Sequence, residues 1–179
     1  MMHRLLLGVA LFAVVWGGAA PSFAEQISAQ MTLLRNQEYQ EALLKGIREA
    51  RKSIVVASYL FKATGSHRNI PARIVDELVK ASRRGIEVTV ILERNQRKED
   101  NLNRDNLHTA ALLNRGGVKV FFDSPRVTTH VKVAVIDRRL VFLGSHNLTQ
   151  SALQHNNELS MLVDSPQLAN EILEYLDRI

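Results

Sequence analysis

Residues 129–147 read Thr-His-Val-Lys-Val-Ala-Val-Ile-Asp-Arg-Arg-Leu-Val-Phe-Leu-Gly-Ser-His-Asn, and Asn157-Glu158 follow shortly after. The first half of this stretch alternates polar and valine residues, which predicts a β-strand. Side chains two apart on a strand point to the same face. We therefore expect His130 and Lys132 to lie side by side, while the valines around them pack on the opposite face.

An imidazole next to an ammonium is suited to phosphate chemistry. Lys132 supplies a fixed positive charge for phosphate oxygens, and His130, with an ordinary pKa near ~6.5, can act as a nucleophile or carry a proton. Gly144 allows a backbone to approach a ligand closely, and Ser145 and Asn147 add a hydroxyl and an amide. Together these groups suit an anionic transition state.

The spacing of these residues resembles a known signature. His-x-Lys, four residues, Asp, six residues and Gly-Ser-x-Asn is the motif of the phospholipase D superfamily, and the chain matches it without a gap from His130 to Asn147. Six identities at fixed spacing arise at a given start position by chance roughly once in ten million or less. The chain is also similar in layout to the small bacterial endonucleases of that superfamily, which carry a signal peptide and one copy of the motif.

The resemblance implies a role for each matching residue. His130 would be the nucleophile that forms a phosphohistidine, and Lys132 and Asn147 would hold the phosphate oxygens. Ser145 and Glu158 would support the site, with the glutamate orienting the imidazole as a third group orients a catalytic base.

Two residues of the motif region have a second interpretation. Asp137 belongs to the implied catalytic set, but it has the opposite strand parity to His130 and begins a turn, where Asp is common for local hydrogen bonding. His146 occupies the variable position of the motif, so it is either a substrate contact or a solvated loop residue. Other histidines, at positions 67, 108 and 155, have no partner at metal-ligand spacing, and the chain has no Cys, so we expect no metal and no cofactor.

Outside the motif, helical and strand patterns alternate along the chain. Helices are predicted over 36–51, 70–84, 107–113 and 166–178, and strands over 53–61, 86–92, 118–122, 131–136, 140–143 and 159–163. This order predicts an α/β domain with a mixed β-sheet flanked by helices on both faces, which is the phospholipase D-like fold that the resemblance implies. A turn at residues 137–139 makes part of the sheet antiparallel.

Length and composition indicate one domain behind an export signal. A chain of 179 residues with 46% hydrophobic content can bury one ordinary core. Residues 1–24 have a basic start, an apolar run and small residues before position 25, so they are predicted to be a signal peptide, with the catalytic domain over 25–179. A retained membrane anchor is the alternative, but the apolar run is shorter than the ~20 residues that span a bilayer. The protein should then be periplasmic or secreted.

Charge favours nucleic acid as the substrate. The chain carries a net charge of +5, and its aromatic content is only 6%, which argues against sequence-specific base stacking. Basic residues in the predicted loops form either a rim for a polyanion or ordinary solvated charge: Lys62, Arg68, Arg97, Lys98 and Arg104. We expect a metal-independent phosphodiesterase that cleaves DNA or RNA without sequence specificity. The alternatives are a phospholipase D acting on membrane phospholipid headgroups and a non-catalytic, secreted nucleic-acid-binding protein.

The presence of a single motif predicts a homodimer. The two-step reaction needs a second histidine to protonate the leaving oxygen and then to activate water. None of the other five histidines is followed by Lys at the second position, and larger members of the superfamily carry two motifs in one chain. A two-fold axis would bring two copies of His130 to one phosphate, so the active site would lie at the dimer interface. The alternative is a monomer that uses His146 or His155 as the acid.

Overall fold

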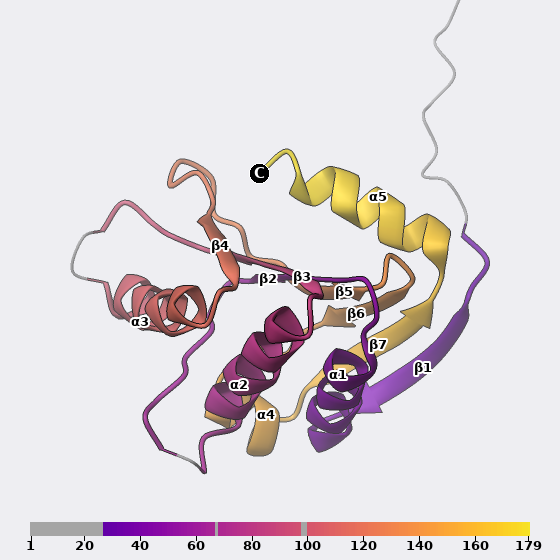
Figure 1. Cartoon of the computed structure of the whole chain (residues 1–179), viewed down its shortest axis with the longest axis horizontal. Coiled ribbons are helices and arrows are strands. Elements are labelled where there is room, and N and C mark those ends of the chain that lie inside the picture. Colours follow the sequence, from indigo (N-terminus) through magenta and orange to yellow (C-terminus); the bar gives the residue numbers. More distant parts are fainter. Residues whose placement is uncertain (1–26, 67, 98–99) are drawn as a thin grey trace, which may run out of the picture.

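The structure is a computed structural model that describes residues 27–66, 68–97 and 100–179. Its strands form one seven-stranded sheet in the order β1-β7-β6-β5-β2-β3-β4 (Figure 1). The strands are β1 (Gln30–Arg35), β2 (Ser53–Ser58), β3 (Glu87–Leu92), β4 (Lys119–Phe122), β5 (Lys132–Ile136), β6 (Leu140–Gly144) and β7 (Leu159–Asp164). The helices are α1 (Gln37–Glu49), α2 (Ile70–Arg83), α3 (Asn101–Arg115), α4 (Gln150–Gln154) and α5 (Pro166–Leu176).

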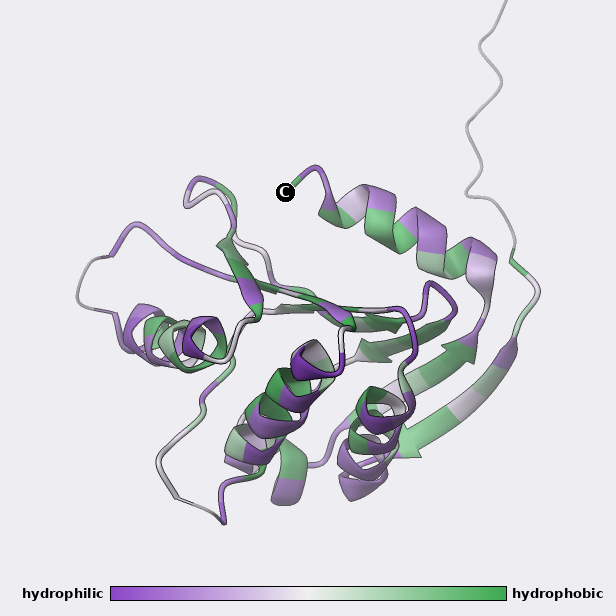
Figure 2. Ribbon diagram, in the orientation of Figure 1, coloured by the Kyte–Doolittle hydropathy of each residue, from purple (hydrophilic) through white to green (hydrophobic). Residues whose placement is uncertain are grey.

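Helices cover both faces of this sheet. α1 to α4 lie on one face and α5 lies on the other (Figure 1). The apolar sides of α1 and α2 face the sheet (Figure 2), where Ile47, Leu78 and Phe142 belong to the larger core. A smaller core packs valines of β5, β6 and β7 against Ala169 and Leu176 of α5. Because β2, β3 and β4 run parallel and the remaining neighbours are antiparallel, the predicted mixed α/β sheet is confirmed.

Local capping signals set several helix boundaries as the sequence predicted. The Asn69 side chain accepts a hydrogen bond from the Ala72 amide at the start of α2, and Pro71 occupies the first turn. The same helix stops before Gly85, whose φ of 87° is a left-handed conformation that favours glycine. Residues far apart in the sequence are not needed for these boundaries.

Three elements differ from the sequence prediction. α3 begins at Asn101, six residues before the predicted start, because Asp100 caps it by accepting from the Leu102 amide. β1 was not predicted: it pairs only with β7 at the edge of the sheet, and Leu34 is its single buried residue, so its apolar pattern is weak. The short α4 was also not predicted.

The predicted signal peptide, residues 1–24, lies outside the described residues. In the part of the chain that the structure does describe, every helix is too short or too polar to cross a membrane.

Candidate active site

The sheet brings most of the motif to one edge, namely the side at which β2 and β6 end and β5 and β7 begin. β5 lies between β2 and β6, and β7 is the next strand beyond β6. β5 runs antiparallel to β2 and to β6, and β6 runs antiparallel to β7, so the starts of β5 and β7 lie beside the ends of β2 and β6. In this register Ser58 of β2 lies opposite Lys132, and Gly144 lies opposite Ser160. Residues separated by up to a hundred positions therefore meet at this edge.

His130 and Lys132 are in direct contact there. The Lys132 Nζ donates to the His130 carbonyl at 2.9 Å and lies 3.4 and 3.5 Å from the two ring nitrogens. The Tyr59 ring packs against the imidazole, with 4.5 Å between the ring centroids and an interplanar angle of 61°. His130 itself is exposed. The imidazole is thus held by an ammonium and an aromatic ring while it stays open to a ligand.

The ammonium of Lys132 is only partly solvated. Its Nζ lies 5.3 Å from the centroid of the Tyr59 ring, and burial lowers the pKa of Lys132, while the negative charge of Glu158 opposes that shift. A cation that has lost part of its water interacts more strongly with an incoming phosphate than a fully hydrated one.

Ser145 and Glu158 form a second cluster at the same edge. The Ser145 hydroxyl donates to the Glu158 carboxylate and accepts from the Leu159 amide at 3.1 Å. The side-chain amide of Asn156 donates a hydrogen bond to the Glu158 carboxylate at 3.1 Å. The backbone N–H of Glu158 donates to the side-chain oxygen of Asn36 at 2.9 Å, and this hydrogen bond fixes the start of β7.

The predicted contact between Glu158 and His130 is not formed within the described chain. The carboxylate of Glu158 is hydrogen-bonded to Ser145 and Asn156 instead. A direct orienting role for Glu158 therefore stays a prediction.

Gly144 ends β6, and Asn147 lies shortly beyond it in the chain. A Cβ on Gly144 would lie 2.6 Å from the Leu159 carbonyl and would overlap Ser160, so glycine is required for β6 to pair with β7 here. Asn147 is half-buried, and its side-chain oxygen is buried without a hydrogen bond to any described residue. Unsatisfied buried polar atoms of this kind are costly and are frequent at ligand sites.

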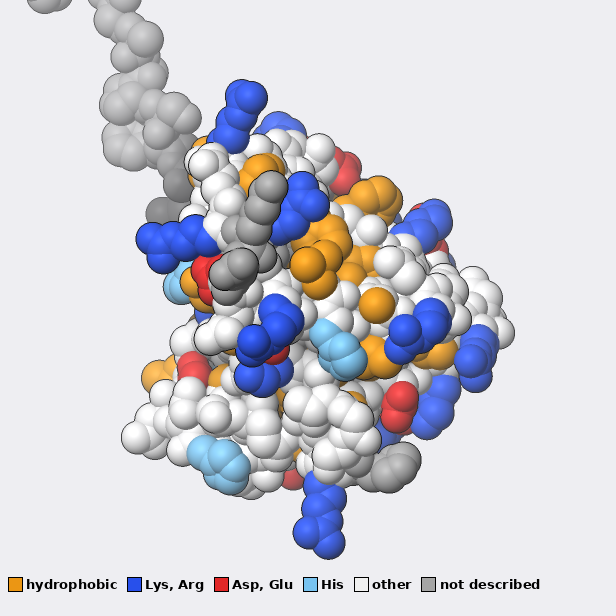
Figure 3. All heavy atoms as spheres, turned by 90° about the vertical axis from the view of Figure 1, so that its left-hand side faces the viewer, with side chains coloured by type: hydrophobic (Ala, Val, Ile, Leu, Met, Phe, Trp, Pro, Cys, Tyr) orange, Lys and Arg blue, Asp and Glu red, His pale blue; other side chains and the backbone are white. Residues whose placement is uncertain are grey.

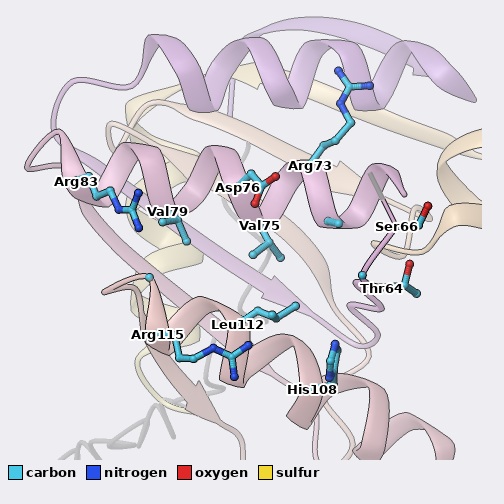
Figure 4. Close-up of a pocket in the computed structure, with 13 residues that line it drawn as sticks. Thr64, Ser66, Arg73, Val75, Asp76, Val79, Arg83, His108, Leu112 and Arg115 are labelled. Carbon is cyan, nitrogen blue, oxygen red and sulfur yellow. The ribbon is translucent and has the colours of Figure 1, made fainter. Parts of the chain in front are cut away.

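The surface has one hollow at the site and a larger one away from it. One of about 320 Å³ lies next to the motif and is walled by His130, Lys132 and Gly144 and by Ile172, Tyr175 and Leu176. A larger one of about 490 Å³ lies elsewhere, between α2 and α3 (Figure 4).

No group of three or more His, Cys, Asp or Glu side chains that could hold a metal ion occurs among residues 27–66, 68–97 and 100–179. Metal-independent chemistry remains a prediction, which a chelator can test.

Comparison with known proteins identifies the family. Residues 43–179 match the family model described as "Cardiolipin synthase, PLD-like domain". The chain belongs to the phospholipase D superfamily.

Two solved structures share this fold. A phospholipase D family member, Nuc from Salmonella typhimurium, aligns with a TM-score of 0.69 and 25% identity over 84% of this chain and 93% of Nuc. NucT from Helicobacter pylori aligns with a TM-score of 0.67 and 23% identity over 84% and 95% of the two chains.

Curated relatives match over part of their length. The phospholipase D of Rickettsia felis is 32% identical over 103 residues, which are 58% of this chain and 48% of that protein. The polyphosphate kinase of Escherichia coli is 28% identical over 108 residues, which are 56% of this chain but 15% of the kinase. This phospholipase D superfamily chain therefore spans less than half of these relatives.

Asp137 is the one motif residue that the fold separates from the others. It follows β5 at the end opposite to Lys132, and its carboxylate accepts from the backbone amides of Arg51, Lys52 and Ser53 at 2.7 to 3.1 Å. Burial would raise the pKa of Asp137, but these hydrogen bonds lower it overall. Asp137 thus anchors the connection between α1 and β2, which agrees with its interpretation as a turn residue, and a catalytic role for it stays a prediction.

His146 is neither a solvated loop residue nor a free acid. It is 1% exposed, its Nε2 donates to the Asn36 carbonyl at 2.9 Å, and its Nδ1 accepts from the Ser160 hydroxyl at 2.7 Å. Its ring stacks on Tyr39 at 4.3 Å. Burial lowers the pKa of His146, which favours the neutral imidazole. The interpretation of His146 as a solvated loop residue was therefore wrong, because its side chain is buried and ties the turn before α1 to β7, whereas a substrate contact stays a prediction.

Sequence reasoning did not identify Tyr59 or Asn36. Tyr59 directly follows the apolar strand β2, and only the pairing of β2 with β5 places it on His130. Asn36 has a φ of 47°, which favours Asn or Gly, but its contacts with Glu158 and His146 cross 110 or more residues.

The basic residues predicted as a rim do not all serve that purpose. Lys62 and Arg104 both pair with Asp105, on α3. Arg68 and Arg97 are exposed, and Lys98 lies outside the described residues.

Proposed function

We propose that this phosphodiesterase of the phospholipase D superfamily is a non-specific endonuclease that cleaves DNA or RNA through a phosphohistidine on His130. The observation that carries the proposal is the exposed imidazole of His130 in contact with the partly desolvated ammonium of Lys132 at one sheet edge. This pair can attack phosphorus and stabilise the charge that develops on its oxygens.

The proposed reaction has two steps. First, a ring nitrogen of His130 bonds to phosphorus, the bond to the leaving oxygen breaks, and a second imidazole donates its proton to that oxygen. Water then attacks phosphorus and gives a proton to the second imidazole, and the bond between phosphorus and His130 breaks. Lys132 and Asn147 would hold the non-bridging oxygens in both steps.

Nucleic acid as the substrate is supported by a basic groove and by structural likeness. Arg83 of α2 and Arg115 of α3 line the hollow of about 490 Å³, with His108 farther along it (Figure 4). Neither arginine forms an ion pair with any described residue, whereas Arg48 and Lys80 nearby pair with Glu77. Lys and Arg side chains also spread over the face that carries α3 and β4 (Figure 3). Such a surface suits a phosphate backbone, and the likeness to Nuc and NucT agrees with it.

A homodimer would supply the second imidazole. His146 is buried and hydrogen-bonded at both nitrogens, His155 is exposed beyond α4, and His108 lines the groove between α2 and α3. None of them is in contact with His130 in the described chain. We therefore propose that His130 of a second copy faces the same phosphate across a two-fold axis.

Export is a further part of the proposal. Residues 1–24 would be removed as a signal peptide, which leaves a periplasmic or secreted enzyme without a stable membrane anchor. N-terminal sequencing of protein recovered from outside the cytoplasm should begin at Glu25, and a retained Met1 would contradict it.

The hollow next to His130 gives a second candidate function some support. Ile172, Tyr175 and Leu176 provide an apolar wall that could contact an acyl chain, as a phospholipase D would require.

One experiment separates the candidates. The purified protein is incubated in EDTA with plasmid DNA, RNA and phosphatidylcholine vesicles, with His130→Ala as the control. We expect cleavage of nucleic acid by the wild type alone. Choline release without nucleic acid cleavage would indicate a phospholipase D, nucleic acid binding without cleavage would indicate a non-catalytic protein, and activity that requires Mg²⁺ would refute the mechanism.

A further inference from the structure

Two carboxyl groups are buried together directly behind the nucleophile. Glu93 follows β3 and Asp123 follows β4, and because these neighbouring strands are parallel, their carboxyl ends meet at the same edge. Glu93 is 2% exposed and Asp123 is 4% exposed. Acidic side chains are almost never buried to this extent without a specific partner.

Both carboxyl groups hold one backbone amide. The Thr129 N–H donates to Glu93 Oε2 at 2.5 Å and to Asp123 Oδ2 at 3.2 Å. The second oxygen of Asp123 accepts from the Arg94 amide at 2.9 Å. Thr129 immediately precedes His130, so this three-centre hydrogen bond lies one peptide unit from the nucleophile.

The pair has no counter-ion among the residues that the structure describes. Neither Glu93 nor Asp123 forms an ion pair with any described residue, and the Arg94 guanidinium lies 5.7 Å from the Phe122 ring centroid instead. Two adjacent carboxylates in a buried site cannot both be ionised without a large cost, so loss of the last proton from the pair is unfavourable. Burial, and after it the hydrogen bond and charge of Asp123, raise the pKa of Glu93 to about 7.

The segment before Thr129 has little other support. Residues 124–128 are all exposed, and Thr129 is the first buried residue after Asp123. The position of His130 therefore depends on the Thr129 backbone on one side and on β5 on the other.

We propose that Glu93 and Asp123, sharing one proton, form a positioning pair that fixes the Thr129 backbone and thereby holds His130 for attack on phosphate. This inference rests on the proposed role of His130 as the nucleophile. When the shared proton is lost, two negative charges face each other, and at least one carboxylate must move toward water. Thr129 then loses part of its anchor, and a nucleophile displaced by about 1 Å can lose about 10²-fold in rate.

Other groups near the pair do not duplicate this function. The titratable or charged groups on the adjoining segments are Tyr59 after β2, Arg94 after β3, Arg126 in the exposed segment before Thr129, and His130 itself. On α3, Asp105 pairs with Lys62. From α3, Asn106 contributes an uncharged amide, which donates to the Glu93 carbonyl at 2.9 Å. The shared proton thus belongs to Glu93 and Asp123.

The test compares Glu93→Gln, Glu93→Ala and the remote control Glu77→Gln in full-length protein. Glutamine keeps an acceptor for Thr129 and can donate its amide to Asp123 at every pH, whereas alanine removes both. Rates are measured between pH 5 and 9 with bis(p-nitrophenyl) phosphate and with plasmid DNA, and thermal unfolding checks that each variant is folded.

We expect kcat of the wild type and of Glu77→Gln to fall as the pH rises above about 7. Because the proton-transfer steps of the mechanism contribute the same pH dependence to every variant, the readout is the ratio of kcat for Glu93→Gln to kcat for the wild type, which should rise as the pH rises above about 7. Glu93→Ala should lose about 10- to 100-fold in kcat with KM changed less than about twofold. A ratio that stays constant from pH 5 to 9 would overturn the proposal, and this comparison holds even if Glu93→Ala does not fold. A wild type that cleaves neither substrate would refute the proposed function instead.

Discussion

Replacement of Asp137 by alanine distinguishes a structural from a catalytic role for this motif residue. Its carboxylate accepts from three consecutive backbone amides: Arg51 at 3.0 Å, Lys52 at 2.7 Å and Ser53 at 3.1 Å. A hydrogen bond to a charged group contributes about 1.5 to 3 kcal/mol. Because this connection is partly exposed and water can replace the carboxylate, we reduce each contribution to about 1 kcal/mol and expect a loss of about 2 to 3 kcal/mol in total.

The assay measures stability and rate on the same samples. For a chain of this size, 1 kcal/mol shifts the melting temperature by about 2 to 4 °C, so Asp137→Ala should melt roughly 4 to 12 °C lower. The values of kcat and KM below the transition should stay within about threefold of the wild type. Asp137→Asn, which keeps one acceptor oxygen, should lose about half as much stability.

The pH dependence provides an independent check. The pKa of Asp137 is lowered in the folded state, so its contribution to stability is fully present above the unfolded pKa of about 3.9 and is lost as the pH falls through the lower folded value. The difference in stability between wild type and Asp137→Ala should therefore shrink in acid. A loss of several orders of magnitude in kcat at unchanged stability would refute the structural role.

Three further predictions follow from the dimer, the groove and the motif glycine. Wild-type and His130→Ala subunits can be unfolded together in equal amounts and refolded. Because random pairing leaves both histidines in about a quarter of the dimers, activity per total dimer should fall to about a quarter of that of pure wild type. Retention of about half of the activity would indicate independent monomers. In the His130→Ala background, the double variant Arg83→Gln/Arg115→Gln should weaken DNA binding and reduce the slope of log K against log salt by up to about 2. The control Arg48→Gln/Lys80→Gln should change the slope less, because these two cations already pair with Glu77. Equal slopes for the two double variants would exclude the groove as the DNA-binding surface. Gly144→Ala should lower the urea midpoint by the equivalent of about 1 to 3 kcal/mol, because the new Cβ would overlap Ser160. The control Gly65→Ala should leave the midpoint unchanged, because no atom lies within 4 Å of its new Cβ. Similar midpoints for the two variants would contradict the close packing of β6 on β7.

The sequence determined the features that depend on neighbouring residues. The alternation from His130 to Val135 and the turn at Asp137 predict β5 and β6, and both strands are present. Caps such as Asn69 and stops such as Gly85 set helix boundaries through contacts within a few residues. The mixed sheet covered by helices follows from the order of these elements, and the motif spacing identifies the family.

Tertiary structure alone decided which motif residues act together. Strand order and register place Tyr59 on His130 and bring the backbone amides of residues 51–53 to Asp137, and neither contact can be read from spacing along the chain. His146 shows the same limit, because its two hydrogen bonds join Asn36 and Ser160 from other elements.

The pairing of Glu93 with Asp123 is the strongest example. Thirty positions separate them in the sequence, and each follows an ordinary strand. Parallel pairing of β3 with β4 brings the two carboxyl groups to one edge, where burial removes water and leaves the Thr129 amide between them. The residue types and the strands are local properties of the chain, but burial and the raised pKa of Glu93 arise only when distant strands pair in register.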